Sequence, residues 1–289
     1  MAGTRLWRYS RNVWWLTRDS VAGWIDHQAS RTGAALAFYT VFSLAPILLL
    51  SIAIASLFFG ESAAHGEIFA QIRGLIGPAG AAAVQSVIAN ASESGAVALT
   101  TAVSVVTVII GATTALVELK AGLDKIWEVP PEQQQGFWYF IRTRLLSVGV
   151  ILALAFLLLV SLVISAGLTA LEKLSQGVHF LNIVLDGVNL LFAFVLVAAL
   201  FGTIYKVLPS TRIAWRDVTI GAVVTAALFS IGKYVIGVYL GNSGLASTYG
   251  AAGSIILLLV WVYYSAQIFL LGAEFTRSYA RHFGSQRVS

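Results

Sequence analysis

The feature that most constrains this chain is a series of long runs that contain no charged residue. Between Arg31 and Glu61 lie 29 uncharged residues, and between Lys233 and Glu274 lie 40. An α-helix needs only about 20 apolar residues to cross the hydrocarbon of a bilayer. Charged residues make up 11% of the chain, against about 25% in a soluble domain. The runs therefore predict an integral membrane protein.

Six helices are predicted to cross the membrane, because short charged connections separate the uncharged runs. The 40-residue run is too long for one helix, and the turn residues Gly-Asn-Ser-Gly at 241–244 divide it. The predicted fold class is an all-α polytopic bundle of six transmembrane helices. The expected spans are about 33–60, 95–118, 144–171, 180–205, 217–240 and 250–273.

Two segments flank the predicted membrane domain of residues 33–274. Residues 1–32 combine arginines with Trp7, Trp14, Trp15 and Trp24 at near-helical spacing. This pattern predicts an uncleaved amphipathic helix that lies on the inner surface of the membrane. Residues 275–289 are predicted to form a basic cytoplasmic tail.

The lysines and arginines are sorted to one side of the predicted bundle. Fifteen of the 18 fall in the N-terminal segment, the second-to-third connection, the fourth-to-fifth connection and the C-terminal tail. Positive charge is retained on the cytoplasmic side, so both termini are predicted to be cytoplasmic. Because the basic residues flank apolar runs and form no dense block, membrane lipids are the expected partners and nucleic acid is not.

Several classes of chemistry are not expected. The chain has no cysteine, which excludes disulfides and thiolate metal sites. Its four histidines, His27, His65, His179 and His282, are scattered singly, so neither a metal nor any other cofactor is expected. The sequence contains no Gly-rich phosphate loop and no compact carboxylate pair, and we therefore expect the protein not to be an enzyme.

Polar side chains within the predicted spans form a candidate polar cavity. Ionisable groups inside a membrane are costly and usually face the interior of a bundle. Asp186 and Lys233 both fall in the outer half of the membrane, where they either pair with each other or extend separately to the headgroups. On the second span, Thr107, Thr114 and Glu118 lie on one polar stripe of the helix. This stripe either lines the cavity or forms a close-packed seam with another helix. The candidate residues are Asp186, Lys233, Asn182, Asn189, Glu118, Thr114 and Thr107.

A second candidate site is a cytoplasmic ion-pair layer where the second and sixth spans end. Its expected members are Glu274, Arg31, Lys120 and Arg277. The layer either locks the helix ends together or acts as a gate. In the first span, Ser43 and Pro46 predict a kink, because proline lacks a backbone donor and clashes with the preceding turn.

Three segments resemble one family of proteins. They are Gly33–Pro46 (GAALAFYTVFSLAP), Gly111–Trp127 (GATTALVELKAGLDKIW) and Tyr249–Glu274 (YGAAGSIILLLVWVYYSAQIFLLGAE). Together they are similar to the YihY/BrkB family of bacterial inner-membrane proteins, in order and spacing over nearly the whole chain. The positions of the resemblance are Ala37, Tyr39, Ser43, Pro46, Trp127, Tyr249, Gly250, Gly253, Trp261, Tyr263, Gly272 and Glu274. The family's common Asn-Arg-Ile-Trp appears here as Asp124-Lys-Ile-Trp127.

The resemblance implies a multi-pass protein of a bacterial inner (plasma) membrane. The family has been labelled a serum-resistance or virulence factor, and also ribonuclease BN, which is regarded as a misassignment. It supplies no catalytic residues. From the residues themselves, the first hypothesis is a transporter-like bundle that moves or exposes a lipid or small amphiphile. The alternative is a non-catalytic envelope scaffold or virulence-associated protein, with a homo-oligomer or an envelope protein as possible partner.

Reporter proteins fused to the two ends test the predicted orientation. Because the basic residues gather on one side, reporters fused to Met1 and to Ser289 should both be active in the cytoplasm. An alkaline phosphatase fusion, which is active only outside the cytoplasm, should stay inactive at both ends. Reporters on opposite faces would contradict an even number of spans.

Overall fold

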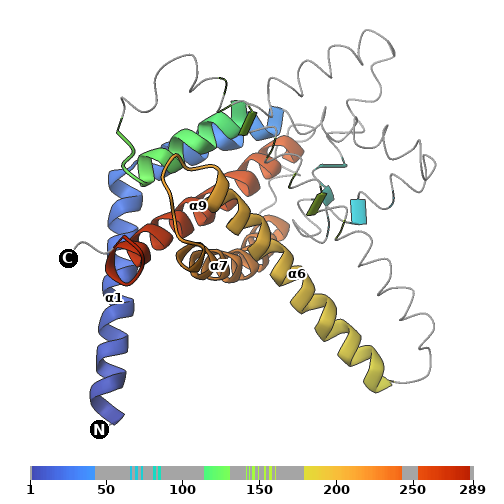
Figure 1. The fold of residues 1–289 in the computed structure, drawn as a ribbon. Helices are drawn as coiled ribbons and strands as arrows, with labels where there is room; N and C mark the ends of the chain where they lie inside the picture. The colour runs from blue at the N-terminus through green and yellow to red at the C-terminus, as the bar shows by residue number, and fades with distance from the viewer. Residues whose placement is uncertain are drawn as a thin grey trace. The chain divides into compact units, whose positions relative to one another are not determined.

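A computed structural model describes residues 2–42, 114–130, 179–242 and 253–286, together with single residues within 66–85 and 141–160. Within these parts the regular elements are all α-helices (Figure 1). This agrees with the uncharged runs, because a backbone in lipid must satisfy its own hydrogen bonds.

The N-terminal helix α1 covers Ala2–Asp26. It ends at a turn formed by His27 and Gln28, where Gln28 has a φ of 55° and the amide of His27 donates to the Gly23 carbonyl at 2.8 Å. The chain resumes as a helix over residues 29–42. On α1, Trp14 and Trp15 are exposed, and the guanidinium of Arg18 lies 5.4 Å from the Trp15 ring centroid. The turn leaves His27 at the C-terminal end of α1.

A second helical stretch, residues 114–126, ends at Trp127 and Glu128. The amide of Val129 donates to the Asp124 carbonyl at 2.9 Å, and that of Glu128 donates to the Lys125 carbonyl at 3.1 Å. This is the Schellman arrangement, in which the residue after the helix adopts a left-handed conformation and is usually glycine. Here Glu128 occupies that position with a φ of 52°, so a charged side chain stands at the end of the helix.

Three long helices follow: α6 (His179–Val207), α7 (Trp215–Asn242) and α9 (Gly253–His282). The segments Gly187–Val207, Trp215–Leu240 and Ile255–His282 are long and apolar enough to cross a membrane. They correspond to the last three predicted spans, and the all-helical membrane fold is confirmed. The first three spans lie wholly or largely outside the described residues, so the count of six stays a prediction.

Large apolar side chains face outward on these helices. On α6, Leu190 is 75% exposed and Leu191 is 63% exposed, and on α7 Tyr234 is 74% exposed. A soluble protein rarely exposes apolar patches of this kind, whereas lipid tails are a suitable solvent for them. The exposed surface of α6 and α7 is therefore the expected surface of a protein in a bilayer.

The chain divides into two compact units, to both of which α7 and α9 contribute. The first unit comprises residues 1–27, 122–230 and 269–289. In its core, the hydroxyl of Tyr205 donates to the Phe269 carbonyl at 2.7 Å and lies 3.2 Å from Thr225 Oγ1. Thr225 in turn donates to the Gly221 carbonyl at 2.7 Å. Hydroxyl groups therefore satisfy one another or the backbone where α6, α7 and α9 meet.

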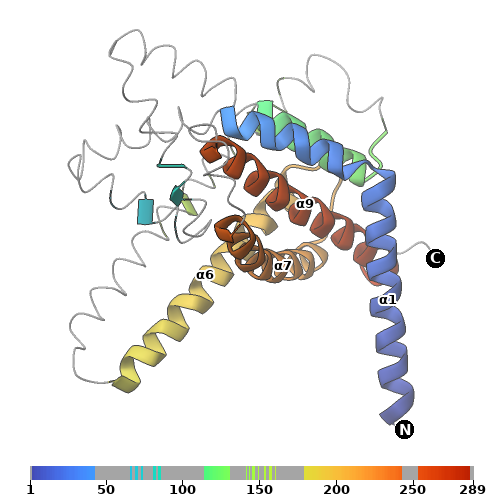
Figure 2. The same ribbon diagram turned by 180° about the vertical axis from the view of Figure 1, so that it is seen from behind.

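The second unit comprises residues 28–121 and 231–268. Figure 2 shows its N-terminal helix, residues 29–42, running beside α9. The two helices approach most closely at Gly33, where an added Cβ would lie 3.1 Å from Gln267 Cδ and 3.6 Å from Ala266 Cβ. In the same unit, a Cβ on Gly232 of α7 would lie 3.1 Å from the Tyr264 hydroxyl. Because Gly33 and Gly232 have no side chains, the helix of residues 29–42 and α7 can each pack closely against α9, near Gln267 and Tyr264.

Gly272 of α9 provides a test of the packing in the first unit. A Cβ there would overlap the Thr225 hydroxyl and would lie 2.7 Å from both Thr225 Cγ2 and the Tyr205 hydroxyl. Gly272→Ala should therefore destabilise the protein by about 1–3 kcal/mol. The measurement is the apparent melting temperature of purified protein in detergent, read by size-exclusion chromatography after heating.

Gly202→Ala on α6 is the matched control. Its added methyl would lie 3.5 Å from the nearest atom, Ala222 Cβ, which is an ordinary contact. Because alanine favours a helix by about 1 kcal/mol over glycine, this variant should be as stable as the parent or more so. Equal melting temperatures for the two variants would contradict the packing argument.

Candidate functional site

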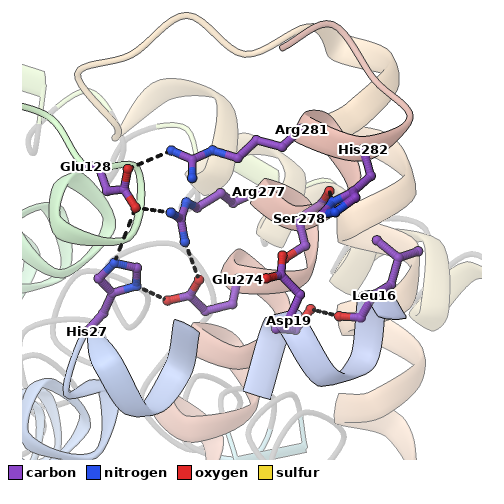
Figure 3. Close-up of polar contacts among 10 residues, drawn as sticks. Leu16, Asp19, His27, Glu128, Glu274, Arg277, Ser278, Arg281 and His282 are labelled. Atoms are coloured by element: carbon purple, nitrogen blue, oxygen red, sulfur yellow. Dashed lines mark hydrogen bonds and ion pairs between the residues drawn. The ribbon is translucent and has the colours of Figure 1, made fainter. Parts of the chain in front are cut away.

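The candidate site is a charged cluster in the first unit, made of His27, Glu128, Glu274, Arg277 and Arg281 (Figure 3). Helix α1 brings His27, the turn after residues 114–126 brings Glu128, and α9 brings the other three. Residues 274, 277 and 281 lie on one face of α9, since helical neighbours are three or four positions apart.

Glu274 lies at the centre of the cluster and is fully buried. Its Oε1 is 2.6 Å from His27 Nδ1, and its Oε2 is 3.4 Å from Arg277 Nη1. A Cβ on Gly23 of α1 would come within 2.5 Å of Oε2. Glycine at position 23 therefore leaves the space that the carboxylate occupies.

Glu128 forms the more exposed side of the cluster, with a side chain that is 51% exposed. Its Oε2 accepts a hydrogen bond from Arg281 Nη2 at 2.8 Å, and its Oε1 pairs with Arg277 Nη2. The same Oε1 lies 3.9 Å from His27 Nε2. A non-glycine residue in the left-handed conformation costs about 1 kcal/mol or more, so these three contacts explain why Glu128 is held there.

The surrounding arginines shift the titration of Glu128. The hydrogen bond from Arg281, with the positive charges of Arg277 and Arg281, holds the pKa of Glu128 below its ordinary value, although partial burial acts in the opposite direction. Glu128 is therefore a carboxylate anion at neutral pH.

Other polar contacts anchor the same helix ends. The hydroxyl of Ser278 donates to Asp19 Oδ2 at 2.6 Å, which ties α9 to α1 about two turns before His27 (Figure 3). Asp217, in the first turn of α7, accepts hydrogen bonds from the amide of Ser285 at 3.0 Å and from its hydroxyl at 2.7 Å. The residues after α9 are therefore fixed to the start of α7.

Asp124 has a similar anchoring role. It is fully buried, and its two oxygens accept from the amide of Ser210 at 2.7 Å and from the Ser210 hydroxyl at 3.0 Å. A carboxylate offers two acceptor oxygens, whereas an asparagine amide offers one. Aspartate therefore suits this position, where both oxygens accept from Ser210.

The structure brings together only part of the predicted ion-pair layer. Glu274 and Arg277 are in contact, whereas Arg31 and Lys120 belong to the other unit, so the layer as a whole stays a prediction. His27, Glu128 and Arg281 were not predicted as members. The one sequence signal for Glu128 is its place directly after the Gly111–Trp127 motif.

The predicted polar cavity is described only in part. Lys233 is half-buried on α7, Thr114 and Glu118 are half-buried on the helix of residues 114–126, and Asn189 is exposed on α6. The backbone of α6 includes Asn182 and Asp186. Asp186 and Lys233 belong to different compact units, so their pairing stays a prediction. Thr107, Ser43 and Pro46 lie outside the described residues.

Gln267 is a polar residue that was not predicted as a site residue. It lies within the apolar segment Ile255–His282, and both its amide nitrogen and its amide oxygen are buried without a hydrogen-bonding partner among the described residues. Buried polar groups almost always have partners, so each exception calls for an explanation. The glutamine is visible in the sequence, but its burial against Gly33 depends on how two distant segments pack.

The described residues contain no group of three His, Asp or Glu side chains placed to hold a metal ion. In the charged cluster, the guanidinium groups of Arg277 and Arg281 neutralise the carboxylate of Glu128. A bound metal ion is not needed for that purpose. The arrangement is suited to ion pairing and to the binding or release of protons.

Comparison with known proteins identifies relatives among membrane proteins. A family model described as "Virulence factor BrkB" matches residues 20–289. A UPF0761 membrane protein of Enterobacter sp. (strain 638) is 30% identical over 194 residues, which cover 67% of this chain and 62% of that protein. One from Teredinibacter turnerae is 28% identical over 268 residues, covering 91% of this chain and 60% of that protein. The UPF0761 membrane protein YihY of Escherichia coli O1:K1 / APEC is 33% identical over 177 residues, covering 61% and 58%.

The chain spans about three fifths of the length of these relatives. No solved structure matches it.

Glu128→Gln tests the ion pairs of the charged cluster. The pKa of Glu128 is lower in the folded protein than in the unfolded chain, so its stabilising effect is complete above about pH 4.3 and disappears as the pH falls through the folded value. At pH 7 the variant should lose about 1 kcal/mol, a modest amount because solvent screens a half-exposed carboxylate.

The difference in melting temperature between parent and variant should be largest at pH 7 and should shrink below about pH 4.3. Asp26→Asn, which removes one negative charge from the exposed end of α1, is the control. A difference that stays constant from pH 7 to pH 3.5, or an equal effect of Asp26→Asn, would contradict this account.

Proposed function

This chain belongs to the virulence factor BrkB family of membrane proteins, and from that premise we propose that it is a transporter-like bundle that moves or exposes a lipid or small amphiphile. We also propose that the protein lies in a bacterial inner membrane, that both its termini are cytoplasmic, and that it is not an enzyme. The names of these relatives say only that they are membrane proteins, so the support comes from the residues of this chain.

The observation that carries the proposal is the buried amide of Gln267. Its segment, Ile255–His282, is otherwise suited to lipid, and an unpaired polar group inside a membrane costs several kcal/mol. Such a cost is tolerated where the group serves binding, because a polar substrate group supplies the missing hydrogen bonds during transport. Gln267 offers one acceptor oxygen and two donor hydrogens for that purpose.

A positively charged residue in the same compact unit supports this interpretation. Lys233 lies inside the apolar segment Trp215–Leu240 and is half-buried. Its neighbour Gly232 packs against Tyr264 and Ile268 of α9, one turn before Gln267 and directly after it. A lysine and an amide on adjoining helices suit a ligand with an anionic or hydrogen-bonding headgroup and an apolar tail, such as a phospholipid.

The alternative function is a non-catalytic envelope scaffold or a virulence-associated protein, with a second copy or an envelope protein as its partner. The description of the matching family favours the virulence association. A scaffold requires no movement of lipid, and measurement of lipid movement therefore separates the two functions.

Gln267→Leu and Lys233→Met test the transporter proposal in vesicles of phosphatidylethanolamine and phosphatidylglycerol that contain a trace of NBD-labelled phosphatidylethanolamine. Dithionite reduces the label on the outer leaflet, and further decay reports lipid that crosses the bilayer. The parent protein should accelerate this crossing. Each variant should slow it about tenfold or more, since losing about 1.4 kcal/mol of stabilisation changes a rate tenfold.

Lys125→Met is the matched control, because Lys125 is an exposed lysine outside the apolar segments. This variant should leave the rate of lipid crossing unchanged. In the same assay, Asp186→Asn tests the residue that was predicted to pair with Lys233. A parent protein no faster than empty vesicles, or variants as fast as the parent, would contradict transport of this lipid class and favour the scaffold.

A further inference from the structure

The charged cluster contains one more titratable group than its ion pairs need. Glu128 and Glu274 supply two negative charges, and Arg277 and Arg281 supply two positive charges, so these four residues balance. The imidazole of His27 is the fifth member. Its protonation changes the charge of the cluster by one unit without breaking any of the arginine pairs.

The two nitrogens of His27 face two different carboxylates (Figure 3). Nδ1 lies 2.6 Å from Oε1 of Glu274, whose side chain is 0% exposed, and Nε2 lies 3.9 Å from Oε1 of Glu128, whose side chain is 51% exposed. With Glu274 ionised, its oxygens only accept hydrogen bonds, and Nδ1 is then the atom that carries the donated hydrogen. The free lone pair of the neutral ring is then on Nε2, toward the more exposed carboxylate.

We propose that His27 and Glu274 form a proton-binding site that exchanges its proton with the surface through the Nε2 side of His27, next to Glu128. The ligand is a proton. Neither the family description nor the fold assigns this site.

The protons balance in a simple relay. A proton from water at the protein surface binds to Nε2, and the ring becomes an imidazolium that faces Glu274 on one side and Glu128 on the other. The Nδ1 proton can then pass along the 2.6 Å contact to Oε1 of Glu274, which leaves a neutral ring protonated on Nε2. One proton has entered at the surface side, and one has reached the buried carboxylate.

Among the residues that the structure describes, the other neighbours of Glu274 do not offer such a route. Arg277 is the second polar group in contact with the carboxylate, and a guanidinium does not release its proton in proteins. Gly23 lies against the carboxylate, since an added Cβ would come within 2.5 Å of Oε2, and it has no side chain to carry a proton. Asp19, one turn earlier on α1, is held by Ser278. His27, with a side chain that is 14% exposed, is therefore the connection between Glu274 and the surface.

A link that served only to hold α1 against α9 would not need histidine, because a glutamine or asparagine amide could donate the same hydrogen bond to Glu274. Histidine is the residue type that exchanges protons between about pH 5 and pH 8. This site goes beyond the transporter proposal and stands or falls without it, because it concerns protonation of the resting protein and no movement of lipid.

The test is nitrogen NMR of the full chain in lipid nanodiscs with ¹⁵N-labelled histidine. The ¹⁵N shifts distinguish a neutral ring protonated on Nδ1 from one protonated on Nε2, and both from the imidazolium. His27→Gln identifies the His27 signals by their loss, and His282→Gln, which removes an exposed histidine on α9, should leave them in place.

At high pH the neutral ring of His27 should carry its hydrogen on Nδ1, and lowering the pH should add a second hydrogen on Nε2. In Glu128→Gln the titration midpoint should fall by about half a pH unit or more, because removing an anion near Nε2 disfavours the cation. A ring protonated on Nε2 alone at high pH, a ring that keeps one state as the pH is lowered, or an unchanged midpoint in a folded Glu128→Gln variant would overturn the proposal.

If Glu128→Gln fails to fold, the tautomer and the titration of the parent protein still decide the question. The lipid-crossing assay does not enter this result, so a failure of transport and a failure of the proton site are separate outcomes.

Discussion

A carboxylate removed from water is tolerated only where donors and opposite charges replace the lost solvent, and Glu274 imposes this condition on its surroundings. The fully buried side chain requires His27 from the end of α1 and Arg277 from its own helix. It also requires glycine at position 23, where a side chain would occupy the same space. Arg277 also pairs with a second carboxylate, that of Glu128. Glu128 reaches it from the left-handed turn after residues 114–126.

The second constraint is the membrane, which makes unpaired polar groups costly. In the first unit this is met by hydroxyl groups that bond to the backbone, as Tyr205 and Thr225 do where α6, α7 and α9 meet. In the second unit Gln267 is an exception, since its amide is buried without a partner. The hydroxyl groups between α6, α7 and α9 have hydrogen-bonding partners, whereas the amide of Gln267 has none among the described residues. Gln267 is therefore the basis of the proposed function.

The site was predicted from the sequence only in part, and for a definite reason. Glu274 and Arg277 are three residues apart on a helix, so their contact follows from local geometry. His27 and Glu128 lie 247 and 146 positions from Glu274 in the chain, and no periodic pattern connects them. Glu128 is also at a helix end where glycine is usual, so the local sequence does not indicate its role. Gln267 was overlooked because its position within an apolar run says nothing about what packs against it.

The sequence by itself determined that the chain is helical and suited to a membrane, because the lengths of its uncharged runs leave the backbone no other way to satisfy its hydrogen bonds in lipid. It also determined where α6, α7 and most of α9 lie. Only the tertiary structure decided that α9 continues to His282, that His27 joins a buried carboxylate to a half-exposed one, and that Asp124 holds Ser210. Hydrophobicity is a property of each segment, whereas a contact between distant segments depends on how all the helices pack together.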